Sequence, residues 1–176
     1  MGPTMINGLP AHVLFVHIVV VMVPLTALLL ILSVLWPAAR RRLGVITPIA
    51  AFATLVAVPL TSHSGEWLEH NSGRTTLIRT HAHLGDQMLL WSAGVVLLSA
   101  VWWAIHDERI RARLKWPAEQ SKTTIANRTV VIAVAVVALA VSIGSAITVY
   151  RIGDSGAKAV WQDRADSAGS ADGDGE

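Results

Sequence analysis

Four long apolar runs constrain this chain more than any other feature of its sequence. They cover approximately residues 11–36, 44–60, 85–105 and 129–150. About 20 helical residues cross a hydrocarbon core of about 30 Å. With 53% hydrophobic residues and a mean hydropathy of +0.52, the 176-residue chain is too apolar for an ordinary soluble domain and too short for several domains. The sequence therefore predicts an all-α membrane protein whose residues 1–150 form a four-transmembrane-helix bundle.

The basic residues predict how this bundle is oriented. Nine of the fourteen Lys and Arg residues follow the first or the third run, and Arg40, Arg41 and Arg42 are adjacent. Loops rich in Lys and Arg stay in the cytoplasm, so we expect both termini to be extracytoplasmic. Residues 151–176 are polar, and their end is acidic and glycine-rich. We predict a largely disordered tail there.

Cysteine usage and net charge exclude several classes of function. The chain has no cysteine, which rules out disulfides, thiolate metal sites and thiol catalysis. The formal net charge of +2 follows from the loops that set the topology and does not indicate nucleic-acid binding. The expected partners are the lipid bilayer and a larger respiratory or other membrane complex, or a homo-oligomer.

The histidines gather at one end of the predicted bundle. The stretch TSHSGEWLEHNSGRTTLIRTHAHLGD, residues 61–86, contains four of the seven histidines together with Glu66, Glu69 and Asp86, and two more histidines open the first run. With the predicted topology, only His106 lies at the inner end. The six outer histidines are His12, His17, His63, His70, His81 and His83.

Helical geometry separates these histidines further. His81 and His83 are about 200° apart at about 100° per residue, so at most one of them faces the bundle core. His12 and His17 are about 140° apart, and His17 lies roughly 10 Å below the start of its helix. An ionisable group at that depth must be paired, so His17 is a site candidate.

Two kinds of site fit these residues. In the first, His17 and either His81 or His83 are axial ligands of haem b, with His12 as a further candidate. In the second, a divalent metal such as zinc or copper binds in the connection between the second and third runs. The residues of that metal site would be His63, Glu66 and His70, with Asp86 or Glu69. The alternative is a purely structural role, in which each histidine only forms a hydrogen bond to the backbone or to a carboxylate.

Three segments resemble a family of small bacterial membrane proteins known as domain of unknown function 2231. They are GLPAHVLFVHIVVVMVPL, VPLTSHSGEWLEH and HAHLGDQMLLW, and the likeness covers roughly residues 9–105. The family's motif positions fall here on Pro10, His12 and His17, on Ser64, Gly65, Glu66 and Trp67, and on His83, Leu84, Gly85 and Asp86. The resemblance implies a four-helix bundle in a bacterial cytoplasmic (inner) membrane. A more distant similarity to membrane b-type cytochromes implies haem held between histidines of facing helices.

The leading functional prediction is a haem- or metal-binding membrane protein that works in redox chemistry or as an accessory to a redox complex. No usual catalytic motif is present, and we expect the chain not to be an enzyme by itself. The alternative is a non-catalytic structural subunit of a larger membrane complex that binds no cofactor. A transporter is disfavoured because no ionisable group reaches the middle of any run.

Overall fold

The computed structural model describes residues 5–6, 9–72, 76–113 and 123–171, and these ranges are almost entirely helical. Four long helices each contain a segment long and apolar enough to cross a membrane. This result confirms the predicted all-α, four-span membrane fold. The elements are β1 (Met5–Ile6), β2 (Leu9–Pro10), α1 (Ala11–Leu35), α2 (Pro37–Leu43), α3 (Ile46–Ser72), α4 (Thr76–His106), α5 (Glu108–Arg113) and α6 (Thr123–Ala171). The two short strands pair antiparallel, with Ile6 opposite Leu9.

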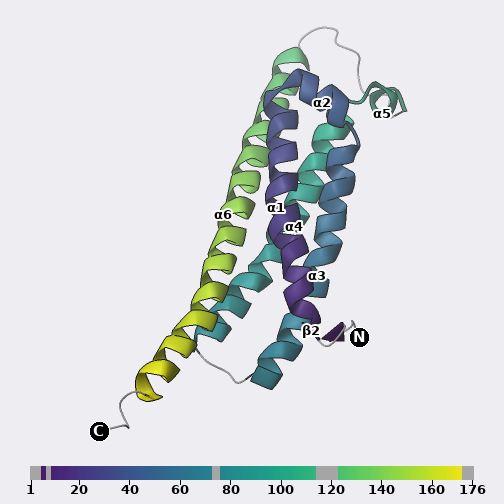
Figure 1. Ribbon diagram of the computed structural model, residues 1–176. Helices are drawn as coiled ribbons and strands as arrows, with labels where there is room; N and C mark the ends of the chain where they lie inside the picture. The colour runs from purple at the N-terminus through teal and green to yellow at the C-terminus, as the bar shows by residue number, and fades with distance from the viewer. Residues whose placement is uncertain (1–4, 7–8, 73–75, 114–122, 172–176) are drawn as a thin grey trace.

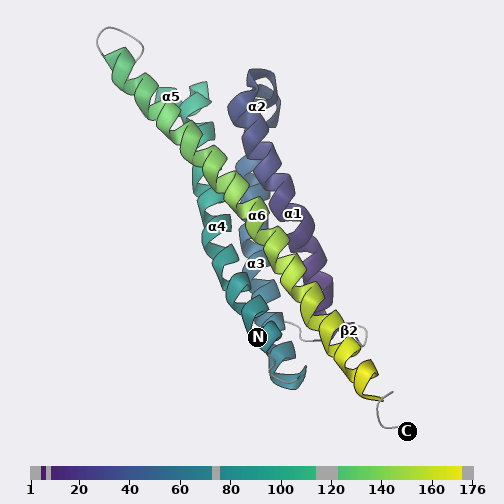
Figure 2. The same cartoon turned by 90° about the vertical axis from the view of Figure 1, so that its left-hand side faces the viewer.

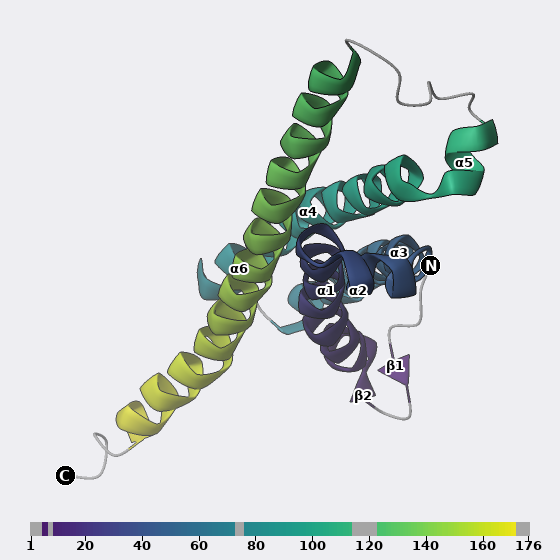
Figure 3. The ribbon, with the colours of Figure 1, turned by 90° about the horizontal axis from the view of Figure 1, so that it is seen from above.

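The long helices form a bundle that runs up and down (Figure 1). Both α1 and α4 pack against α3 and α6, so α1 and α4 lie on one diagonal of the bundle. The view from above shows α6 crossing the other helices at an angle (Figure 3). Helix α1 begins, and α6 ends, at the same end of the bundle, while α2 and α5 lie at the opposite end (Figures 1 and 2). We call these the histidine end and the arginine end.

The stretch 61–86 is helical on both sides of residues 73–75, where a loop was expected. Helix α3 continues past Pro59 to Ser72, and α4 already begins at Thr76. Proline removes one backbone donor, which neighbouring helices and hydroxyls can compensate in a membrane bundle. Thr61 and Ser64 are buried just beyond Pro59, so packing continues the helix where composition indicated a connection.

The predicted disordered tail is also corrected, because residues 151–171 continue α6. Ile152 and Ala159 are buried on one face of this extension. On its exposed side, Lys158 Nζ donates to Asp154 Oδ2 at 2.8 Å, one helical turn apart. A buried stripe and an i, i+4 ion pair both favour helix over coil. Residues 172–176 lie outside the described residues.

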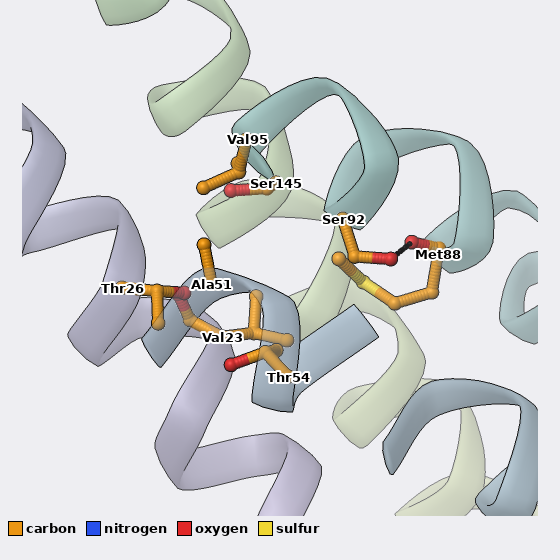
Figure 4. A pocket seen from close by; sticks show the side chains of 8 residues that line it. All are labelled: Val23, Thr26, Ala51, Thr54, Met88, Ser92, Val95 and Ser145. Atoms are coloured by element: carbon orange, nitrogen blue, oxygen red, sulfur yellow. Dashed lines mark hydrogen bonds between the residues drawn. The ribbon is translucent and has the colours of Figure 1, made fainter. Parts of the chain in front are cut away.

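The middle of the bundle is closed by a layer of small and hydroxyl-bearing side chains (Figure 4). Their hydroxyls bond within their own helices, as Thr26 does to the carbonyl of Met22 at 2.9 Å and Ser92 to that of Met88 at 2.9 Å. No water-sized space remains between them. The layer consists of Val23, Thr26, Ala51, Thr54, Met88, Ser92, Val95 and Ser145. It separates the interior at the two ends of the bundle.

Close approach of α4 and α6 depends on Gly144. A Cβ atom at this position would lie 2.4 Å from two atoms of the Trp91 ring. Ser142 and Ser145, on the same helix, are fully buried. Small residues let helix backbones approach in membranes, and the small residues of α6 allow this close contact with α4.

Candidate cofactor site

A cavity of about 570 Å³ opens between all four long helices at the histidine end. Its walls are mostly aliphatic, with Val16, Val19, Val58 and Val149 among them. Four ionisable side chains also line it, and these are His12 on α1, Glu66 on α3, and His81 and Asp86 on α4. Cofactor pockets typically measure about 300–1,000 Å³ and combine apolar walls with a few polar groups. This cavity has both properties.

His12 is held by the neighbouring helix α3. Its Nδ1 lies 3.0 Å from the backbone carbonyl oxygen of Thr61. The ring passes directly over Gly65, where a Cβ atom would lie 2.9 Å from both Nδ1 and Cε1. Any larger residue at position 65 would therefore have to displace the His12 imidazole.

His81 is held in the same way by α6. Its Nδ1 lies 3.0 Å from the backbone carbonyl oxygen of Ile152 and 3.1 Å from Ser155 Oγ. A Cβ atom at Gly156 would lie 3.0 Å from Cε1 of the ring. The buried face of the α6 extension therefore completes the site, which explains why a prediction of disorder after residue 150 concealed it.

The two supports share one local pattern, which we call the serine–glycine support. In each, a carbonyl is followed by a serine three residues later and a glycine four residues later. Ser64 Oγ donates to the carbonyl of Thr61 at 2.8 Å, and Ser155 Oγ donates to that of Ile152 at 2.9 Å. The serine and the imidazole share the carbonyl oxygen, and the glycine makes room for the ring.

The similarity between the two histidine supports extends along α1 and α4 into the core of the bundle. His12, Val19 and Val23 of α1 have the same spacing as His81, Met88 and Ser92 of α4, and the last two residues of each set are buried. No internal repeat is evident from the sequence alone, because the residue types differ at most of these positions. The structure shows that the pairs α1–α3 and α4–α6 build their histidine supports alike.

The two supported rings face each other across the bundle diagonal. Their centroids are 6.4 Å apart, and their planes are nearly perpendicular at 88°. A carbonyl oxygen only accepts hydrogen bonds, so Nδ1 of each ring carries the hydrogen. In the neutral imidazole, Nε2 then carries the lone pair and is the nitrogen available to a ligand.

The side chains of His17 and His83 do not line this cavity. Both side chains are exposed, and Nδ1 of His17 is bonded to the carbonyl of Val13, one turn earlier in its own helix. The expected contrast between His81 and His83 is confirmed, since only His81 reaches the cavity. The structure therefore brings together His12 and His81, and it does not bring His17 into this pair.

The residues considered for a divalent metal are spread out. His63 Nδ1 and Glu66 Oε2 are 3.9 Å apart, but their side chains are 57% and 68% exposed. Asp86 is an exposed residue at the cavity, and the side chains of Glu69 and His70 lie outside the described residues. Within the described part of the chain, no three His, Cys, Asp or Glu side chains are placed to hold one metal ion.

Sequence reasoning missed the residues that orient the rings. They are the carbonyls of Thr61 and Ile152 and the glycines at positions 65 and 156. The signal that could have found them is the dipeptide Ser-Gly, which occurs in α3 and in α6 at the histidine end of the bundle. Its meaning depends on which helices face each other, which the sequence does not state.

The model of a family described as "Predicted membrane protein (DUF2231)" matches residues 8–169. No curated protein matches the chain, and no solved structure does, so the link to b-type cytochromes stays a prediction. Because the family model covers most of the sequence, including α1, α3, α4 and nearly all of α6, the chain belongs to this family of multi-pass membrane proteins.

Proposed function

We propose that this protein binds haem b between His12 and His81 and serves in electron transfer, alone or as an accessory to a redox complex. The observation that carries the proposal is the pair of imidazoles on diagonal helices, each fixed through Nδ1 by a carbonyl of another helix. Metal-ligating histidines commonly donate their second ring N–H to a carbonyl or carboxylate, which fixes ring orientation and raises basicity. Both rings have this arrangement.

The separation of the rings supports one group held by both of them. Metal–nitrogen bonds of about 2.0–2.1 Å to each ring could connect one metal centre to His12 and His81, whose ring centroids are 6.4 Å apart. A cavity of about 570 Å³ between apolar walls suits a flat, largely apolar cofactor.

The number of protein ligands favours haem over a single zinc ion. A structural zinc site takes four protein ligands and a catalytic site three. Haem brings its own equatorial nitrogens and needs at most two ligands from the protein. Two supported imidazoles, with no third ligand grouped beside them among the described residues, meet that need.

The bound group would supply one-electron chemistry, and the chain's residues would set the conditions for it. His12 and His81 would both hold the group through Nε2. The valine walls would keep the surroundings apolar, and the backbone carbonyls would hold both rings in place. This arrangement fits electron transfer better than catalysis at the metal.

The charge distribution supports a prediction of which side of the membrane the site faces. The arginine end contains Arg40, Arg41 and Arg42 in α2 and Arg109, Arg111 and Arg113 in α5. By the positive-inside rule this end faces the cytoplasm, so the histidine end would face the extracytoplasmic side of a bacterial inner membrane.

Absorption spectroscopy of the purified full-length protein tests the proposal. We expect a Soret band and sharp reduced-state bands that carbon monoxide leaves unchanged, because both axial positions are filled. His12→Ala and His81→Ala should each remove or transform this spectrum. His17→Ala and His83→Ala are matched controls on the same two helices, and they should leave it unaltered.

Different outcomes would contradict the proposal. A colourless protein that does not take up added haemin, with or without copurified zinc or copper by elemental analysis, would exclude haem. Loss of the spectrum in His17→Ala and not in His12→Ala would show that His12 is not a ligand and that the proposed pair is wrong. A colourless, metal-free protein that copurifies with a large membrane partner would favour the structural-subunit alternative.

A further inference from the structure

A second cavity, of about 550 Å³, lies at the arginine end of the bundle, on the other side of the closed middle layer. It is bordered by the ends of α1 and α4 and by α2 and α5. Its inner part contains the hydroxyl-bearing residues Ser33, Thr47 and Ser99, and its outer part contains arginines. This change from small polar to cationic lining distinguishes it from the histidine-end cavity.

Trp102 forms a rigid wall of this second cavity. The side chain is only 4% exposed, and its Nε1 donates to the carbonyl of Ser33 at 3.0 Å. The His106 ring packs on it with centroids 4.3 Å apart, and His106 Nδ1 bonds the carbonyl of Trp102 at 2.8 Å. A buried indole held at its nitrogen keeps one fixed face.

Arg40 lies over this indole. Its Cζ is 5.7 Å from the Trp102 ring centroid, within the range of a cation–π contact. In the part of the chain that the structure describes, no carboxylate is within ion-pair distance of the guanidinium. Burial, and secondarily the charge of Arg41, lower the pKa of Arg40 from its ordinary value. Among the described residues, this half-buried cation therefore lies at the cavity without an anionic partner.

Neither acidic residue that lines the cavity forms an ion pair with Arg40. Asp107 Oδ1 accepts the backbone N–H groups of Arg109 at 3.0 Å and Ile110 at 3.1 Å, so it caps the start of α5. Glu108 is exposed to solvent. Three arginines line the same cavity, and these are Arg40, Arg41 and Arg109.

We propose that this cavity binds a phosphate group, supplied by an anionic phospholipid or by a soluble phosphate compound. A guanidinium matches a phosphate with two parallel hydrogen bonds, and stacking on an aromatic ring pre-orients it. Basic pockets between transmembrane helices are known to bind anionic lipid head groups. The inference is independent of what binds at the histidine end.

Phospholipid binding to the purified full-length protein tests this inference. Native mass spectrometry would compare phosphatidylglycerol with phosphatidylcholine for the wild type, Arg40→Gln and Arg42→Gln. We expect phosphatidylglycerol to bind the wild type about tenfold more tightly than Arg40→Gln, because a charge-assisted hydrogen bond is lost. Arg42, the matched control, belongs to the same helix but does not line the cavity, and its variant should differ by less than about twofold.

Added inorganic phosphate distinguishes the two sources. If it displaces phosphatidylglycerol at millimolar concentration, the site accepts free phosphate; if it does not, the site is one for lipid. Arg40→Lys retains the charge without the planar fork and should fold, so an intermediate affinity would support the proposal even if Arg40→Gln is unstable. Equal affinity in the wild type and both Arg40 variants, or equal losses in Arg40→Gln and Arg42→Gln, would overturn it.

Discussion

The two ends of this bundle contain cavities of nearly equal size, about 570 and 550 Å³, with opposite chemistry. At the histidine end, backbone carbonyls fix two imidazoles between mostly aliphatic walls. At the arginine end, three guanidiniums that stay charged at any ordinary pH line the cavity, and one of them lies over a buried indole. A layer without water-sized space lies between the two cavities.

This contrast follows from the cost of removing charge from water. Moving a neutral imidazole from water into an apolar cavity costs little free energy, provided that its N–H is hydrogen-bonded. A guanidinium cannot give up its charge and must stay close to solvent or to an anion. In the middle layer, the hydroxyls of Thr26 and Ser92 accordingly bond carbonyls of their own helices.

The largest expected effects test whether the two cavities bind their ligands independently. His81→Ala should abolish the proposed haem spectrum and leave phosphatidylglycerol binding unchanged, and Arg40→Gln should do the reverse. The closed layer between the cavities is the reason for this independence. Absorption spectra and native mass spectrometry on the same preparations check both readouts, and a variant that loses both would show that the ends are linked.

The serine–glycine supports should be the next most sensitive feature. Gly65→Ala and Gly156→Ala would place a methyl group 2.9 and 3.0 Å from the rings of His12 and His81. Displacing a supported ligand typically costs about 10–100-fold in metal affinity, and haem titration measures the loss.

Two other glycines of the same cavity provide controls for this prediction. A Cβ atom at Gly85 or Gly153 would meet no heavy atom within 4 Å. Gly85→Ala and Gly153→Ala should therefore retain haem affinity close to that of the wild type. If all four variants weaken binding equally, cavity volume and not ring support would be the cause.

Packing between α4 and α6 is expected to respond more moderately. Gly144→Ala would force the Trp91 ring to move and should lower the free energy of unfolding by about 1–3 kcal/mol. Gly94→Ala is a milder comparison, because its Cβ atom would lie 3.1 Å from a single atom of Val141. Denaturation in mild detergent measures both variants, and a Gly144→Ala protein as stable as the wild type would disprove the close contact.

The smallest expected effect concerns a hydroxyl in the core. Ser142 Oγ is buried and has no hydrogen-bond partner in the described structure, whereas Ser92 Oγ donates to two backbone carbonyls. Ser142→Ala should leave stability unchanged or raise it by up to about 1 kcal/mol, because an unsatisfied buried group is removed. Ser92→Ala should lower it, and a reversed order in the same unfolding assay would contradict this assignment.

Hydropathy and charge predicted the structural features that are set within a single helix, without reference to its neighbours. The spans, the short arginine-rich connection and the opposite orientations of His81 and His83 follow from length and helical period. Depth in the membrane made His17 a candidate, but its Nδ1 finds the carbonyl of Val13 within α1 and needs no partner from another helix. The pairing of His12 with His81 depends on which helices share a diagonal, and a single chain's composition does not encode that directly.

The acceptors that hold the two imidazoles belong to the main chain, and this determines which sequence changes the site can tolerate. Threonine at one acceptor position and isoleucine at the other perform the same task, so the bond itself does not specify a side chain, although both residues are buried. The restriction is stricter one turn later, where a Cβ atom would lie 2.9 or 3.0 Å from a ring. A genetic screen would therefore find several buried residue types accepted at the acceptor positions and glycine favoured one turn later.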